Sequence, residues 1–186
     1  GQDGTVLIWE TATGRQYLAF ATGTPVDGQI EFSPECVAPP TAPYTWCGVF
    51  LATGNRDGLV RLWDVTPTGS REVMTVPGFW HCLAPDGMRL HTGLAEGSDV
   101  QIHTWQFPEL TSVVEPSDAL TPPGQELSSY PAGKREILMT MVFTPDCSRS
   151  AMIDRTNLIA TITDMESGTQ LLQFKLAEGT PSMFAP

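Results

Sequence analysis

The 186-residue chain is long enough for the core of one domain, and it carries a net charge of −11 without a basic cluster. This charge argues against nucleic acid and anionic membrane surfaces as partners. An apolar run of about 18 residues and a signal-peptide pattern are both absent from the sequence.

Short segments with strand character alternate with turn residues along the chain, and none of them predicts a helix. The segments 36–47 (CVAPPTAPYTWC) and 115–135 are rich in proline and lack periodicity, so both are predicted to be loops. Evenly spaced short strands are typical of an all-β fold. The predicted strands are residues 5–10, 17–20, 29–32, 49–53, 59–64, 72–76, 80–83, 89–92, 100–105, 110–114, 138–143, 150–153, 158–164, 170–174 and 182–184.

The stretch 51–64 (LATGNRDGLVRLWD) predicts a strand, a turn and a second strand. Asp57-Gly58 is the turn signal, because glycine accepts the positive φ that a tight hairpin turn requires. Residues 90–97 (LHTGLAEG) match the start of this stretch 39 residues later. With one extra residue in the following turn, His103 is predicted at the position of Trp63, with Trp105 just beyond it.

Further copies of the same unit occur at both ends of the chain. Residues 151–164 match 51–64 in length, and residues 3–10 match its second half. A second motif opens each repeat, as FSPE at 32–35, LAPD at 83–86, FTPD at 143–146 and FAP at 184–186.

These two interleaved motifs resemble the WD40 repeat, which recurs about every 40–45 residues with four strands per propeller blade. The resemblance implies an all-β, WD40-type β-propeller segment of about 3.5–4 blades. A seven-bladed ring needs roughly 280 residues at about 40 per blade, so we interpret the chain as part of a larger 7- or 8-bladed propeller. The expected divisions are 1–20 for the end of blade 1, 29–76 for blade 2, 80–114 for blade 3, 115–135 for a loop insertion, 137–174 for blade 4 and 182–186 for the start of the next.

The resemblance also implies structural positions. In WD40 repeats an Asp in the turn joins a hydrogen-bonded set with a His, a Ser or Thr and the Trp of the third strand. Thr53, Asp57 and Trp63 match three members, but the usual Gly-His pair is absent from the sequence. The expected structural WD-type positions are Trp9, Thr53, Asp57, Trp63, Asp64 and Asp164.

Family geometry places the turns between second and third strands, and the connections between blades, on a top face that binds proteins. Trp, Tyr and Arg are also the types enriched at binding hot spots. Two alternatives stay open: Trp80 as a core residue and Arg56 as a solvated turn residue. The expected partner-binding residues are Arg56, Phe79, Trp80, Arg155 and, on the insertion, Tyr130.

Catalytic patterns are missing. The histidines (His81, His91 and His103) have no convincingly placed carboxylate or cysteine in the sequence, and no GxSxG, HExxH or phosphate-loop motif occurs. The cysteines show no zinc spacing; thiols in a reducing compartment are expected, with a Cys36–Cys47 bridge as the alternative.

The sequence therefore predicts a non-enzymatic, cytoplasmic scaffold without a cofactor. It would mediate protein–protein contacts within a larger complex, or with other domains of a longer chain. The alternatives are the sensor half of a multidomain signalling ATPase and a propeller enzyme or cofactor-binding propeller.

Overall fold

The computed structural model describes residues 1–33, 49–66, 68–85, 88–96, 99–107, 124–134, 140–154 and 157–177. Within them the chain is all-β, as predicted, and no helix that could cross a membrane is found. The strands are β1 (Thr5–Trp9), β2 (Gln16–Ala21), β3 (Val26–Phe32), β4 (Val49–Asn55), β5 (Leu59–Thr66), β6 (Gly69–Pro77), β7 (Trp80–Leu83), β8 (Arg89–Glu96), β9 (Asp99–Gln106), β10 (Gln125–Lys134), β11 (Thr140–Phe143), β12 (Arg149–Asp154), β13 (Ile159–Asp164) and β14 (Gln170–Lys175).

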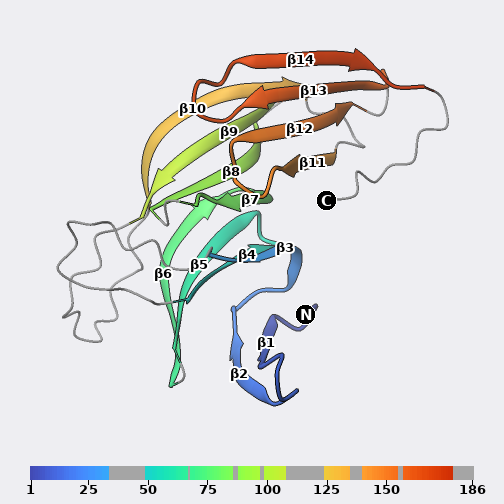
Figure 1. Ribbon diagram of the computed structural model, residues 1–186. Helices are drawn as coiled ribbons and strands as arrows, with labels where there is room; N and C mark the ends of the chain where they lie inside the picture. The colour runs from blue at the N-terminus through green and yellow to red at the C-terminus, as the bar shows by residue number, and fades with distance from the viewer. Residues whose placement is uncertain are drawn as a thin grey trace.

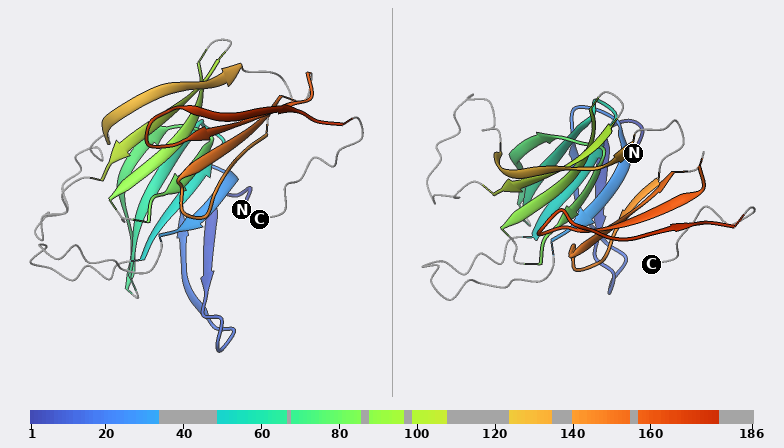
Figure 2. Two further views of the ribbon diagram at one scale, coloured as in Figure 1. Left: turned by 45° about the horizontal axis from the view of Figure 1, so that its top comes forward. Right: turned by 90° about the horizontal axis from the view of Figure 1, so that it is seen from above.

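Each repeat of the sequence forms one antiparallel sheet, which we call a blade (Figure 1). Blade 1 consists of β1 and β2, and three four-stranded sheets follow: β3–β6 as blade 2, β7–β10 as blade 3 and β11–β14 as blade 4. The first strand β7 touches both β3 and β11, so the first strands of successive blades lie side by side. The blades therefore follow one another as in a propeller, and Figure 2 shows this from two further directions.

Three apolar clusters hold the blades together, because the strands bury side chains on both faces. In β5, Val60 and Leu62 pack toward blade 3, while Trp63 and Val65 pack with Val6 of blade 1. A third cluster joins Ile102 and its neighbours in blade 3 to blade 4. Alternate residues of a strand point to opposite faces, so this two-sided burial explains the bulky residues at consecutive positions.

The predicted loop insertion at 115–135 is wrong in its second half. Residues Gln125–Lys134 form β10, which pairs with β9 from Gln125↔Gln106 to Lys134↔Asp99 and is the outer strand of blade 3. Two register shifts accommodate its irregular composition, one of them beside Pro131. Proline is tolerated at such edge positions, since its nitrogen need not donate to a neighbouring strand. The predicted outer strand 110–114 lies outside the described residues, as do the segments 36–47 and 182–186.

The predicted alignment of blade 3 with blade 2, which put His103 at the position of Trp63, is also wrong. Thr53 lies opposite Arg61 in blade 2, and Thr92 lies opposite His103 in blade 3. The β8–β9 hairpin is longer than expected, because pairing continues to Glu96↔Asp99. Trp105, not His103, therefore stands at the position of Trp63.

The expectation of free thiols is wrong for one pair of cysteines. Cys82, in β7, forms a disulfide with Cys147, in the turn between β11 and β12, with their Cα atoms 5.9 Å apart. The two residues are 65 positions apart in sequence, and only the packing of blade 3 against blade 4 brings them together. Cys36 and Cys47 lie outside the described residues.

Candidate functional site

A buried chain of hydrogen bonds runs from the third strand of blade 2 to the connection that precedes it. The Trp63 indole N–H donates to Thr53 Oγ1 (3.0 Å), and the Thr53 hydroxyl donates to Asn55 Oδ1 (3.0 Å). The Asn55 amide then donates to Thr22 Oγ1 (3.2 Å) and to the Thr24 carbonyl (3.1 Å). Thr53 and Asn55 are 0% and 2% exposed. Since buried polar groups cost free energy unless paired, this chain fixes the β2–β3 connection onto blade 2.

The turn between β4 and β5 is held from its outer side by an ion pair. Asp57 Oδ2 lies 2.6 Å from an Arg61 guanidinium nitrogen, and Asp57 also accepts bonds from the Thr24 hydroxyl (3.3 Å) and the Leu59 N–H (3.2 Å). Partial burial raises the pKa of Asp57, but the hydrogen bond and charge of Arg61, together with the hydrogen bonds from Leu59 and Thr24, outweigh it. The pKa is therefore held below its ordinary value.

The three matched WD-type residues thus lie in one network, although Asp57 does not touch Thr53. Asn55 connects them through the Thr24 hydroxyl, where WD40 repeats would use a histidine. Sequence reasoning missed Asn55. The sequence feature that could have indicated Asn55 is an amide side chain at the end of a predicted strand, a position that is buried in the structure.

The same indole-to-threonine bond recurs in blade 3, with a different continuation. The Trp105 N–H donates to Thr92 Oγ1 (2.8 Å), and the Thr92 hydroxyl donates to the carbonyl of Pro77 (2.9 Å), in the strand that ends blade 2. Both blades therefore use a Trp–Thr pair to attach themselves to the preceding connection.

The other expected WD-type positions have different surroundings. Trp9 is 53% exposed on β1. Asp64 lies 3.5 Å from the Arg71 guanidinium. Asp164 accepts bonds from the backbone N–H (2.9 Å) and hydroxyl (2.7 Å) of Ser167 and so closes the turn after β13. The Ser167 bonds, the backbone one first, hold the pKa of Asp164 below its ordinary value.

Arg56 and Phe79 each lie beside the β4–β5 turn, and we call the end of the blades that carries this turn the top face. Arg56 is exposed at the tip of the turn, and its N–H donates to the Pro25 carbonyl (2.9 Å). Phe79, in the β6–β7 connection, is 44% exposed. Its ring lies beside Gly58, where an added Cβ would stand 3.4 Å from it; Gly58 has φ +78°, a conformation that favours glycine.

The described structure does not place the other predicted partner-binding residues beside the β4–β5 turn. Trp80 begins β7, and Tyr130 stands in β10 opposite Ile102 rather than on a loop. The side chains of Trp80 and Tyr130, and all of Arg155, lie outside the described residues.

One histidine, His103, has partners that the sequence did not show. His103 Nδ1 lies 3.0 Å from Glu126 Oε1, and its Nε2 lies 3.6 Å from Glu96 Oε1, so a carboxylate does flank this ring. The hydrogen bond to His103 lowers the pKa of Glu126. His81 is fully buried, and burial lowers its pKa to about 4 against a partial offset from the Ala52 backbone. A neutral, buried His81 fits a core position.

Comparisons with known proteins identify the fold. No family model matches the chain, and none of the curated proteins matches it. It is similar to a chain in the crystal structure of the mitotic checkpoint complex, with 14% identity over 94% of this chain and 47% of that one, and a TM-score of 0.57. It is also similar to the WD40 domain of Toxoplasma gondii coronin, with 11% identity over 95% of this chain and 41% of that one, and a TM-score of 0.57. The chain thus has the fold of a WD40-type β-propeller and spans less than half the length of these structures.

Proposed function

We propose that this WD40-type propeller segment is a non-catalytic platform that binds a protein partner through its top face, around Arg56 and Phe79. The observation that carries the proposal is the network beneath these residues. Asn55, Asp57 and Arg61 fix the turn that presents Arg56. An arginine and an aromatic side chain on a rigid support are the features of a binding hot spot, because little conformational entropy is lost on binding.

The open edge of blade 1 supports a second kind of contact, with further strands of a propeller. A hollow of about 440 Å³ lies between β1 and β3, lined by apolar side chains that include Leu7, Ile30 and Phe32. These three are 50%, 48% and 47% exposed. Unpaired strand edges with apolar neighbours pair readily with other strands. We infer that strands of the same longer chain, or of another chain, fill this hollow.

The experiment compares proteins that copurify with the tagged chain from its own cells, measured by quantitative mass spectrometry. The test variant is Arg56→Ala/Phe79→Ala. The control is Arg15→Ala/Tyr17→Ala, which removes another exposed arginine and an exposed aromatic residue (76% and 39% exposed) from other surfaces. We expect at least one copurifying protein to fall about fivefold or more only in the test variant, as loss of a hot spot predicts. Equal recovery with all three chains would reject the top face as the binding site.

The charge of −11 supports a protein partner over nucleic acid or an anionic membrane. The cytoplasmic location remains a proposal, and the Cys82–Cys147 disulfide does not favour it, since such bonds persist mainly in oxidising compartments. Alkylation of the protein in intact cells, followed by peptide mass spectrometry, tests it. Two alkylated thiols at these positions support a reducing compartment, and an unmodified disulfide rejects it.

A further inference from the structure

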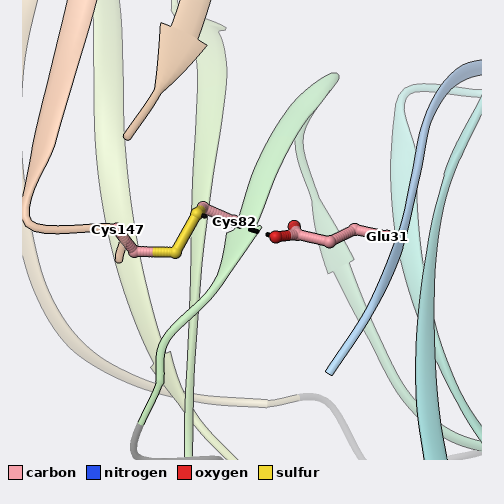
Figure 3. A group of neighbouring side chains, drawn as sticks. All are labelled: Glu31, Cys82 and Cys147. Carbon is pink, nitrogen blue, oxygen red and sulfur yellow. Dashed lines mark hydrogen bonds between the residues drawn. A yellow bond between two sulfur atoms is a disulfide. The ribbon is translucent and has the colours of Figure 1, made fainter. Parts of the chain in front are cut away.

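Three side chains from three consecutive blades meet beside the first strands (Figure 3). Glu31 comes from β3 in blade 2, Cys82 from β7 in blade 3 and Cys147 from the β11–β12 turn of blade 4. One carboxylate oxygen and the two sulfurs all lie within 4.8 Å of one another. None of these three residues belongs to the hydrogen-bond network of Thr53, Asn55 and Trp63, so the network does not explain why they lie together.

The carboxylate of Glu31 is held in a defined position by the backbone. The Leu83 N–H donates to Oε2 (3.1 Å), and Oε1 faces Cys82 Sγ at 3.9 Å. Because a disulfide sulfur carries no hydrogen, this second approach is a contact in the oxidised chain. One oxygen is thus fixed by a hydrogen bond, and the other is directed at the sulfur pair.

Glu31 is also a partly buried acid. Burial raises its pKa, and the Leu83 N–H offsets this only in part. No lysine, arginine or histidine within the described ranges forms an ion pair with it. Cys82 and Cys147 are both 3% exposed. A negative charge in such a place is stabilised by a bound cation.

We propose that, once the disulfide is reduced, Glu31, Cys82 and Cys147 form a binding site for a divalent metal ion of the zinc class. Two thiolates and one carboxylate are ligands that Zn²⁺ accepts, at about 2.3 Å for sulfur and about 2.0–2.2 Å for oxygen. The side chains already lie close enough to bond to each other, so small rotations bring both sulfurs onto one ion. Three protein ligands leave a fourth tetrahedral position for water or a partner's side chain.

The chemistry balances with a thiol reductant. Two reductant thiols give two electrons and two protons to the Sγ–Sγ bond, which breaks into two cysteine thiols, and the reductant becomes a disulfide. Binding of the divalent ion then displaces the two thiol protons to solvent. The oxidised and metal-bound forms are mutually exclusive, because one sulfur pair serves both. Either form links blade 3 to blade 4, and the metal would add Glu31 of blade 2 as a third ligand.

The test uses the chain with Cys36→Ser and Cys47→Ser, so that only Cys82 and Cys147 remain as thiols. The protein is reduced with a phosphine, which leaves as its oxide, desalted without oxygen and titrated with Zn²⁺ against a chromophoric chelator. Co²⁺ absorption provides a second readout, because thiolate ligands give a characteristic charge-transfer band. We expect one ion per reduced chain and no binding by the oxidised chain, which also serves as a folded control of identical sequence.

Variants assign the ligands. Cys82→Ser and Cys147→Ser should each abolish the Co²⁺–thiolate spectrum of the reduced chain. Glu31→Gln should weaken Zn²⁺ binding about tenfold or more, whereas Glu166→Gln, at an exposed turn residue, should leave it unchanged. Circular dichroism verifies that each variant is folded. The proposal is overturned if the reduced chain takes up no ion, if binding survives the loss of either cysteine, or if Glu31→Gln binds as tightly as the parent.

Discussion

The Asn55 side chain fixes the turn between β4 and β5 to the connection before blade 2. Its Oδ1 accepts a hydrogen bond from the Thr53 hydroxyl, which itself accepts one from the Trp63 indole N–H. Its amide donates to the Thr22 hydroxyl, in the connection before blade 2. In a buried position each lost partner leaves a donor or acceptor without water to replace it. The stability of this turn should therefore depend on every member of the chain.

Thr53→Val tests that dependence, since valine keeps the shape of threonine and removes only the hydroxyl. The Trp63 N–H and Asn55 Oδ1 would both lose their partner, so we expect the free energy of unfolding to fall by about 2–3 kcal/mol. Urea unfolding followed by tryptophan fluorescence measures it. Thr169→Val, at an exposed turn residue, is the matched control, with an expected change below about 0.5 kcal/mol. A loss in Thr53→Val no greater than in the control would contradict the network.

The free energy of unfolding at acidic pH should depend on the ionisation of Asp57. Its pKa in the folded chain lies below the ordinary 3.8. The stabilisation is thus present above that value and is lost as the pH falls through the folded-state pKa. Asp57→Asn cannot ionise, so the difference in unfolding free energy between parent and variant should shrink from pH 6 to pH 3. Urea unfolding across this range measures it, and a constant difference would contradict the assigned role of the Arg61 ion pair.

Among the strands, the central ones are predicted from the sequence, whereas β10 is not. The paired motifs around 51–64 and 90–97 predict the central strands, because a recurring turn and alternating apolar residues are local signals. β10 has neither: its residues QELSSYPAGK are mostly polar, and its register shifts twice. An outer strand gains its order from pairing with β9, and that long-range interaction leaves no periodicity in its own sequence.

Amide hydrogen exchange tests the assignment of β10. Backbone N–H groups paired with β9 exchange slowly, so we expect peptides from 125–134 to be protected at a level similar to peptides from β6, the outer strand of blade 2. Peptides from the exposed turn at 10–15 provide the fast reference within the same sample. Exchange of 125–134 as fast as that turn would restore the loop interpretation.

The candidate site was only partly predictable for the same reason. Thr53, Asp57 and Trp63 were found because they belong to a repeating motif. Asn55 and the Cys82–Cys147 bond were not, because each depends on which segments pack together. The His103 position was misassigned, since the length of the β8–β9 hairpin is set by pairing that a one-residue gap does not reveal.

At the scale of the whole molecule, the blades form a series with two different ends. Between blades 1 and 2, the rings of Trp63 and Phe20 pack with their centroids 4.9 Å apart. At one end β1 borders an apolar hollow, and at the other β14 exposes Leu171, Leu172 and Phe174. Exposed apolar residues on edge strands favour association with further protein.

If this chain is a platform held in a larger assembly, native mass spectrometry of the protein from its own cells should detect that assembly directly. The native mass is compared with the denatured mass of the same sample, for the parent and for Arg56→Ala/Phe79→Ala. We expect a parent assembly heavier than its denatured chain, with at least one subunit missing from the variant. A native mass equal to the denatured mass in the parent would contradict this expectation.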